Sequence, residues 1–204
     1  YSSNSILEGN PFNERPVRAA MRSWKELRAK IKQRISQPMP KKIHHFLRTV
    51  LERDDEILSQ RSRHFHEVIG GAVTVLPPDT RHVDCNVIPL TIAGGCLYHC
   101  GFCQVKSGKH FVPRTHENIC EQIENLKRFY GQDLPNYSSL FLGQHDALHA
   151  GLDLLQFAAA KAYELFDFNR SYLKESYLFL FGSADSFLRS QEKLFESINR
   201  FPYS

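Results

Sequence analysis

Hydrophobic residues in the first third of the chain recur at a helical spacing. From Val17 to Ile35 an apolar residue returns every three or four positions, and Pro16 suits the first turn of a helix. The segment QPMPKK at 37–42 interrupts this pattern. A second stripe then runs as one helix from Ile43 to Leu58, and glycine and proline residues follow it. The pattern predicts a helical N-terminal extension over residues 1–78.

Beyond residue 78, short apolar runs alternate with helical stripes. Three runs are predicted strands, each followed by glycine: VIPLTIA (87–93), SLFL (139–142) and YLFLF (177–181). A helix is expected after each of them: one that begins at the N-cap Thr115, one from Leu152 to Tyr163, and one from Phe187 to Ile198. This alternation predicts an α/β fold of right-handed βαβ units around a parallel sheet.

The turns that follow the predicted strands are the places to look for chemistry. Ligands of parallel sheets bind beyond the carboxyl ends of the strands. The three turns read GGCLYHC, GQHDAL and GSADS. All three contain glycine and polar side chains, so a binding site is expected where they meet.

Composition and charge narrow the class of protein. The chain has 204 residues, 42% of them hydrophobic and 24% charged, which is typical of a globular domain. No apolar run approaches the roughly 20 residues of a membrane span, and no secretory signal pattern opens the chain. We therefore expect no membrane partner and a cytoplasmic location.

The cysteines are distributed unevenly. Of five cysteines, three fall in a span of eight residues as C-x3-C-x2-C: Cys96, Cys100 and Cys103. This spacing is not a disulfide framework, and clustered thiols in a reducing compartment serve metals. A zinc site would need a fourth ligand, for which His99 and His110 are candidates. Three thiolates that leave one metal position open suit a [4Fe–4S] cluster instead.

The motif, with an aromatic residue before its last cysteine and its place just after a strand, closely resembles the radical S-adenosylmethionine (radical SAM) superfamily. The resemblance implies a radical SAM-type parallel βα barrel in which Cys96, Cys100 and Cys103 hold a [4Fe–4S] cluster and Phe102 lies near the adenine of S-adenosylmethionine. It also implies reductive cleavage of that cofactor. The resulting 5′-deoxyadenosyl radical would abstract hydrogen from a substrate that these residues do not identify.

The turn after the second strand resembles one branch of that superfamily. FLGQHDAL is similar to the FL-x-x-G-D-A-L variant of the elongator-like and coproporphyrinogen-oxidase-like proteins, although it departs from the more common Gly-Gly-Glu turn. The resemblance implies contacts from this turn to the methionine end of the cofactor, by Gly143, Gln144, His145 and Asp146. Ser183, after the third strand, is a candidate for the cofactor ribose or for the substrate. Helix capping is the alternative role for Asp146 and Ser183.

The basic residues gather in the helical extension. Residues 14–42 hold ten Lys or Arg against two Glu, a net charge of +8, which leaves −4 for the rest because the whole chain carries +4. A solvated helix face is one interpretation. The others are contact with RNA through the basic helix 15–35, or docking of an electron donor such as flavodoxin or ferredoxin.

Two functions from different classes remain open. The first is a radical SAM enzyme, of which residues 79–204 form the first half of the barrel, because three βα units are half of the usual number. The second is a non-enzymatic module, stabilised by zinc or an iron–sulfur cluster, that binds nucleic acid. Metal identity separates the two, since the first requires iron and sulfide.

Overall fold

The computed structural model describes residues 11–70, 86–98, 110–143 and 146–190, together with 194, 196 and 199. Contacts divide the chain into two compact units, Tyr1–His64 and Phe65–Ser204. The division falls inside a helix, α3 (Asp55–Ile69). The predicted domain boundary at 78/79 lies outside the described residues.

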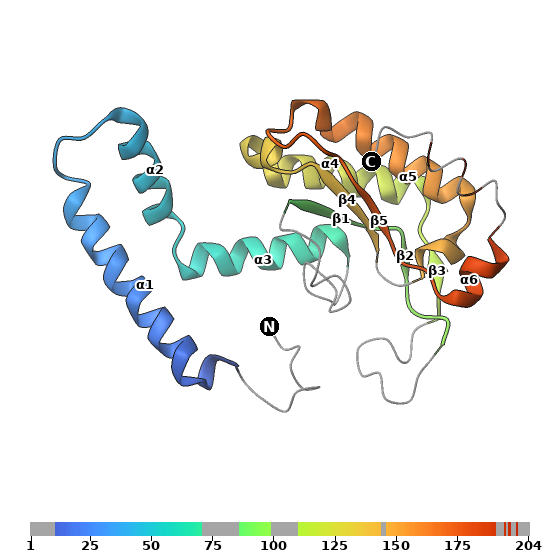
Figure 1. Cartoon of the computed structure of the whole chain (residues 1–204), viewed down its shortest axis with the longest axis horizontal. Helices are drawn as coiled ribbons and strands as arrows, with labels where there is room; N and C mark the ends of the chain where they lie inside the picture. Colours follow the sequence, from blue (N-terminus) through green and yellow to red (C-terminus); the bar gives the residue numbers. More distant parts are fainter. Residues whose placement is uncertain are drawn as a thin grey trace. The chain divides into compact units, whose positions relative to one another are not determined.

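The first unit is helical (Figure 1). A short 3-10 turn, η2 (Pro11–Asn13), precedes α1 (Arg15–Arg34), which has proline in its first turn, and α2 (Lys41–Glu52). The side chain of Arg28 in α1 donates to the carbonyl oxygens of Val50 at 2.9 Å and Leu51 at 2.8 Å. Both carbonyls lie in the last turn of α2, where backbone oxygens have no partner within the helix. Arg28 therefore caps α2 and joins the two helices.

The single helix predicted from Ile43 to Leu58 is wrong. The structure has two helices, because α2 ends at Glu52 and α3 begins at Asp55. The carboxylate oxygen Oδ1 of Asp54 accepts the backbone N–H groups of Glu56 at 3.1 Å and Ile57 at 3.0 Å. Asp54 thus acts as an N-cap, and it starts a new helix within a continuous apolar stripe.

The second unit is built on a three-stranded parallel sheet with the order β1-β4-β5. The strands are β1 (Val87–Thr91), β4 (Ser139–Gly143) and β5 (Leu178–Leu180). Register pairs Leu90 with Leu142, and Leu142 with Leu180. The predicted parallel α/β arrangement is therefore present in these residues. Three strands do not close into a barrel, so the barrel stays a prediction.

Both long helices of this unit cover the same face of the sheet (Figure 1). These are α4 (His116–Tyr130), which Thr115 caps as predicted, and α5 (Leu152–Phe166). The core contains alternate strand residues (Ile88, Leu90, Ile92, Leu140, Leu142) together with apolar residues of both helices. Strands added in one direction with helices on one face differ from a doubly wound sheet, whose helices lie on both faces.

The remaining elements are short and surround the sheet. A two-stranded antiparallel pair, β2 (Ala93–Gly94) and β3 (Val112–Pro113), follows β1 and was not predicted. The 3-10 turns are η4 (Gly131–Asn136), η5 (Ala147–Ala150) and η6 (Phe168–Arg170). The third predicted helix is interrupted: α6 (Ala184–Arg189) ends where Ser190 turns to an extended conformation, and Leu194 and Glu196 beyond it are helical again.

A buried glutamine of α4 contacts the backbone of β1. The side-chain oxygen of Gln122 accepts the N–H of Thr91 at 2.8 Å, and its amide nitrogen donates to the carbonyl of Thr91 at 2.9 Å. Gln122 is 2% exposed, so burial leaves both of its polar atoms dependent on these bonds. The side chain therefore pairs with Thr91 much as a neighbouring strand would.

Within the described part of the chain, no helix combines the length and the apolar character that crossing a membrane requires.

Candidate functional site

Side chains from three turns meet beyond the carboxyl ends of the sheet strands. Tyr98 follows β1, Asp146 follows β4 and Ser183 follows β5. The hydroxyl of Tyr98 donates to Ser183 Oγ at 2.5 Å, and Ser183 Oγ donates to Asp146 Oδ2 at 2.6 Å. These three strand ends are where the sequence placed the chemistry, and the hydrogen bonds join all of them.

Asp146 is the buried centre of this cluster. It is 6% exposed, and its Oδ2 accepts both the Ser183 hydroxyl and the Ser186 hydroxyl, the latter at 2.7 Å. Its other oxygen, Oδ1, is buried and has no hydrogen-bond partner among the described residues. A buried acceptor without a partner costs stability, and such groups are concentrated at functional sites. Oδ1 is therefore placed to accept a donor from a ligand.

Ser183 has the capping role that the sequence left open, and it also belongs to this cluster. Its hydroxyl accepts the backbone N–H of Ser186 at 3.1 Å, which makes it the N-cap of α6. The same hydroxyl accepts from Tyr98 and donates to Asp146. For Asp146, by contrast, no side-chain capping bond to the following turn η5 is present. Its carboxylate contacts α6 instead.

Of the three predicted cysteine ligands, Cys96 is the one that the structure describes. Its thiol is free and half-buried. The backbone of Cys96 forms an isolated bridge with His110, so the two ends of the segment 97–109 lie side by side. Cys100, Cys103 and Phe102 lie outside the described residues. Among the described residues alone, no group of three metal-binding side chains occurs, and the ligand set stays a prediction.

The turn after β4 is described in part. Gly143 ends the strand, and its carbonyl accepts the N–H of Ile92 at 2.8 Å. A Cβ at Gly143 would lie 2.6 Å from the ring carbon Cε1 of Phe141, which gives this glycine a packing reason independent of any ligand. Gln144 and His145 lie outside the described residues, so their predicted contacts with a cofactor remain predictions.

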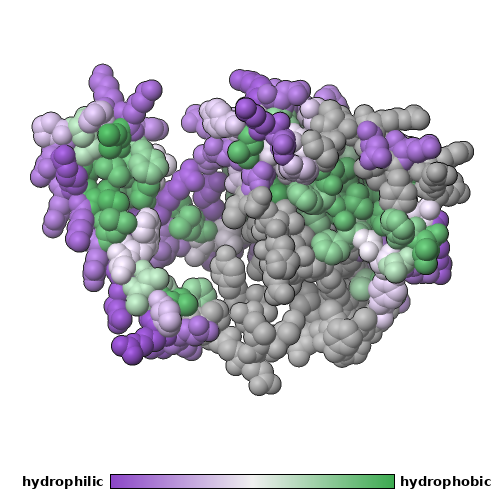
Figure 2. Space-filling view, in the orientation of Figure 1, coloured by the Kyte–Doolittle hydropathy of each residue, from purple (hydrophilic) through white to green (hydrophobic). Residues whose placement is uncertain are grey.

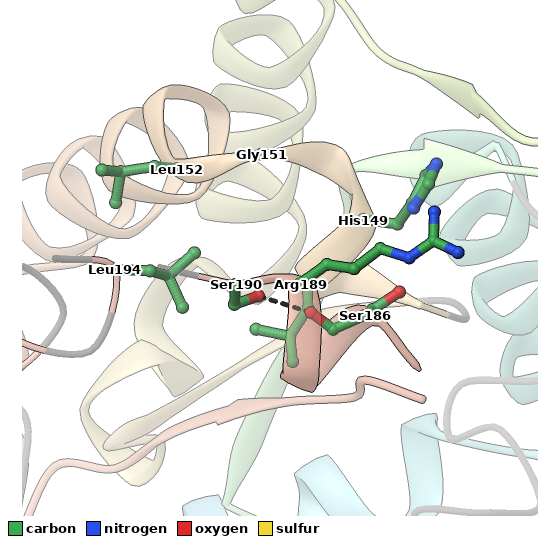
Figure 3. A pocket seen from close by; sticks show the side chains of 8 residues that line it. His149, Gly151, Leu152, Ser186, Arg189, Ser190 and Leu194 are labelled. Carbon is green, nitrogen blue, oxygen red and sulfur yellow. Dashed lines mark hydrogen bonds between the residues drawn. The ribbon is translucent and has the colours of Figure 1, made fainter. Parts of the chain in front are cut away.

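A pocket of about 430 Å³ adjoins the cluster (Figure 3). Ser186 and Arg189 of α6 line it together with His149 of η5, and the side chains of His149 and Arg189 extend toward the same side. Arg189 also donates to Asp185 Oδ1 at 3.0 Å. Because Ser186 also donates to Asp146, the pocket shares a residue with the cluster. A ligand at the cluster would therefore have polar groups of α6 beside it.

Sequence reasoning missed several residues of this site. Tyr98 stands inside the C-x3-C spacing, and Ser186 follows Ser183 by three positions, the usual distance from an N-cap to its partner N–H. That spacing could have placed Ser186 at the start of α6. Nothing local in the sequence joins Tyr98 to Ser183, which lies 85 positions away.

The basic helix α1 carries its charges on the surface. Its Lys and Arg side chains are exposed apart from half-buried Arg28, which caps α2. Large apolar residues of the same helix are also exposed, among them Met21, Trp24 and Leu27. Figure 2 shows these two kinds of surface next to each other on the helical unit. The predicted contact of this helix with RNA or an electron donor remains a prediction.

Comparison with protein-family models, curated proteins and solved structures finds no match to this chain.

Proposed function

We propose that this chain has the function of a radical SAM enzyme. The observation that carries the proposal is the buried Oδ1 of Asp146, which has no hydrogen-bond partner among the described residues. It lies beyond the strand ends in a cluster that includes Tyr98 of the cysteine motif. A free thiol at Cys96 and an acceptor without a donor fit a cluster-bound cofactor that carries an amino group. The predicted cytoplasmic location belongs to this proposal.

The proposal assigns separate roles to the chain's own residues. Cys96, with Cys100 and Cys103, would hold the [4Fe–4S] cluster. Asp146 Oδ1 would accept an N–H from the amino group of S-adenosylmethionine, while the Ser183 and Ser186 hydroxyls hold Oδ2 and so fix the carboxylate. When bound and reduced, a [4Fe–4S] cluster held by these cysteines would supply one electron for the reductive cleavage of S-adenosylmethionine.

The first experiment is anaerobic reconstitution with iron and sulfide. We expect about four iron and four sulfide per chain, the content of one [4Fe–4S] cluster. After reduction with dithionite, the electron paramagnetic resonance signal should shift when S-adenosylmethionine is added. A flavodoxin or ferredoxin should replace dithionite as the reductant. A reconstituted protein without iron would contradict the proposal.

Two cysteine variants make a matched pair for this experiment. Cys96 and Cys120 are both free, half-buried thiols. Cys96→Ala should abolish the cluster because it removes a ligand, whereas Cys120→Ala should keep the full iron content. Equal iron in the two variants would mean that Cys96 is not a ligand.

A second function is favoured by the bridge between Cys96 and His110. That bridge brings a histidine beside the cysteine motif, as a zinc site with three Cys and one His requires. The module would then bind nucleic acid through α1, with affinity that falls steeply as salt rises. Purified protein that contains one zinc, takes up no iron and binds RNA would establish this second function in place of the enzyme.

A further inference from the structure

We propose that Tyr98 is a positioning residue that fastens the loop carrying Cys96 to the exit of β5. The effect of this contact on cofactor binding rests on the proposed function. The contact between Tyr98 and Ser183 does not rest on the proposed function, because it can be tested on metal-free protein. Tyr98 stands two positions after Cys96 in the sequence. Its hydroxyl reaches Ser183 of the turn that begins α6.

The Ser183 hydroxyl uses its full hydrogen-bonding capacity in this contact. It accepts from the Tyr98 hydroxyl at 2.5 Å and from the Ser186 N–H at 3.1 Å, and it donates to Asp146 Oδ2 at 2.6 Å. A hydroxyl has one donor and two acceptor positions, and all three are occupied. Rotation of Ser183 would therefore break a helix cap or a contact to Asp146, so Tyr98 is held by a group that is itself fixed.

The contact between Tyr98 and Ser183 joins the turns that follow β1 and β5, two strands that are not neighbours in the sheet. β4 lies between β1 and β5 in the sheet, so no backbone pairing connects the β1 exit to the β5 exit. On its other side, the cysteine loop is held by the backbone bridge between Cys96 and His110. In the described residues, the Tyr98 hydroxyl is the side-chain contact that ties this loop to the Asp146 cluster. It thereby sets where Cys96 stands relative to the unpartnered oxygen of Asp146.

Tyr98 acts through Ser183 and does not touch the cofactor itself, so the test needs measurements that report the position of the cysteine loop. The key variant is Tyr98→Phe, which deletes one hydroxyl and keeps the ring. Tyr172→Phe is the matched control, because Tyr172 is 79% exposed and lies in the loop before β5, away from the cluster. Ser183→Ala removes the other partner of the hydrogen bond, and Ser183→Thr keeps a hydroxyl.

The first measurement is the alkylation rate of Cys96 in metal-free protein, with Cys120 as the internal reference. The loss of a hydrogen bond of ordinary net strength corresponds to roughly a twofold to tenfold change in how often the loop opens, and so in the alkylation rate. We expect Tyr98→Phe to raise the alkylation rate of Cys96 by that factor and to leave the alkylation rate of Cys120 unchanged. In the control variant Tyr172→Phe, both alkylation rates should equal those of the unmodified chain. The double variant Tyr98→Phe/Ser183→Ala should be no faster than Ser183→Ala, because both changes remove the same bond. A Cys96 rate in Tyr98→Phe equal to that of the unmodified chain would overturn the proposal.

The second measurement is titration of the reconstituted protein with S-adenosylmethionine, followed by electron paramagnetic resonance. Tyr98→Phe should keep full iron content and need roughly twofold to tenfold more cofactor for the spectral shift. Tyr172→Phe should need the same amount of cofactor as the unmodified chain, and Ser183→Thr should need less cofactor than Ser183→Ala because it keeps a hydroxyl. If Tyr98→Phe raises the alkylation rate of Cys96 but leaves the affinity for S-adenosylmethionine unchanged, Tyr98 has no role in cofactor binding. An unmodified chain that takes up no iron would overturn the proposed function, while the alkylation rates would still decide the contact.

Discussion

The helices α1 and α2 contain no buried residue, whereas β1 and β4 are buried at every position. Both regions have well-formed secondary structure and regular apolar patterns. In the second unit the apolar residues of strands and helices form one core. In the first, large apolar side chains such as Met21, Trp24 and Leu27 lie exposed beside basic ones (Figure 2), and Arg28 links the helices by polar contacts.

This difference shows that a helical pattern and a stable core are separate properties. Helices in proteins derive most of their stability from packing of the apolar face. α4 has that packing, with Ile119, Ile123 and Leu126 fully buried, while the stripe of α1 has no comparable burial. Changes in the two units should therefore differ in size, even where the residue types are the same.

The largest effect is expected from matched leucine truncations. Leu142→Ala empties part of the sheet core, where Leu142 is 0% exposed, and should lower the free energy of unfolding by about 2–5 kcal/mol. Leu27→Ala in α1, where Leu27 is 47% exposed, should change it by about 0.5 kcal/mol or less. Urea unfolding followed by circular dichroism measures both. Equal losses would mean that Leu27 belongs to a core as well.

A smaller effect is expected at Gly182, between β5 and the Ser183 turn. A Cβ at this position would lie 2.1 Å from Leu148 Cδ1 of η5, so Gly182→Ala should cost about 1–3 kcal/mol by overpacking. Leu148→Ala removes most of the clashing atoms, so it should cost less stability when added to Gly182→Ala than when made alone in the unmodified chain. Gly94→Ala is the control, because no atom lies within 4 Å of its Cβ position. Thermal unfolding of the four variants decides whether the contact is as close as described.

The smallest effect is expected at the helix caps of the two units. Thr115→Ala removes the hydroxyl that accepts the Asn118 N–H in α4 and should cost about 1 kcal/mol. Glu14→Ala at the start of α1 should cost close to nothing, since Glu14 makes no side-chain capping bond. Nuclear magnetic resonance gives a second readout. The backbone N–H of Glu117 and then the Thr115 hydroxyl lower the pKa of Glu117, so that pKa should rise in Thr115→Ala.

Much of the fold could be predicted from local pattern. The strands at 139–142 and 177–181, and the N-cap Thr115, followed from runs and caps of adjacent residues, and the structure confirms them within a few positions. The break at Asp54 had a local signal too, an acidic N-cap with acidic residues after it. The continuous apolar stripe from Ile43 to Leu58 hid that signal. The pair β2 and β3 was missed because strands of two residues have no period.

The candidate site could be predicted only in its strand-end residues. Ser183 was found because parallel strands bring their carboxyl ends to one edge, and Asp146 because its turn resembles the FL-x-x-G-D-A-L variant. The bond between Tyr98 and Ser183, and the donation of two hydroxyls to one oxygen of Asp146, depend on side-chain positions set by the whole fold. Residue types and spacing do not encode such contacts.

The pairing of Gln122 with Thr91 has a consequence for how this sheet can grow. Directly after β1, Ile92 points its N–H toward Gly143 of β4, so Thr91 and Pro89 present their backbone to the outer edge of the strand. Gln122 occupies the groups of Thr91, and Pro89 has no N–H to offer. A strand from another chain would find few partners there, which protects β1 from edge-to-edge aggregation. Further strands of the sheet would then be added beside β5, where the backbone edge has no such cover in the described residues.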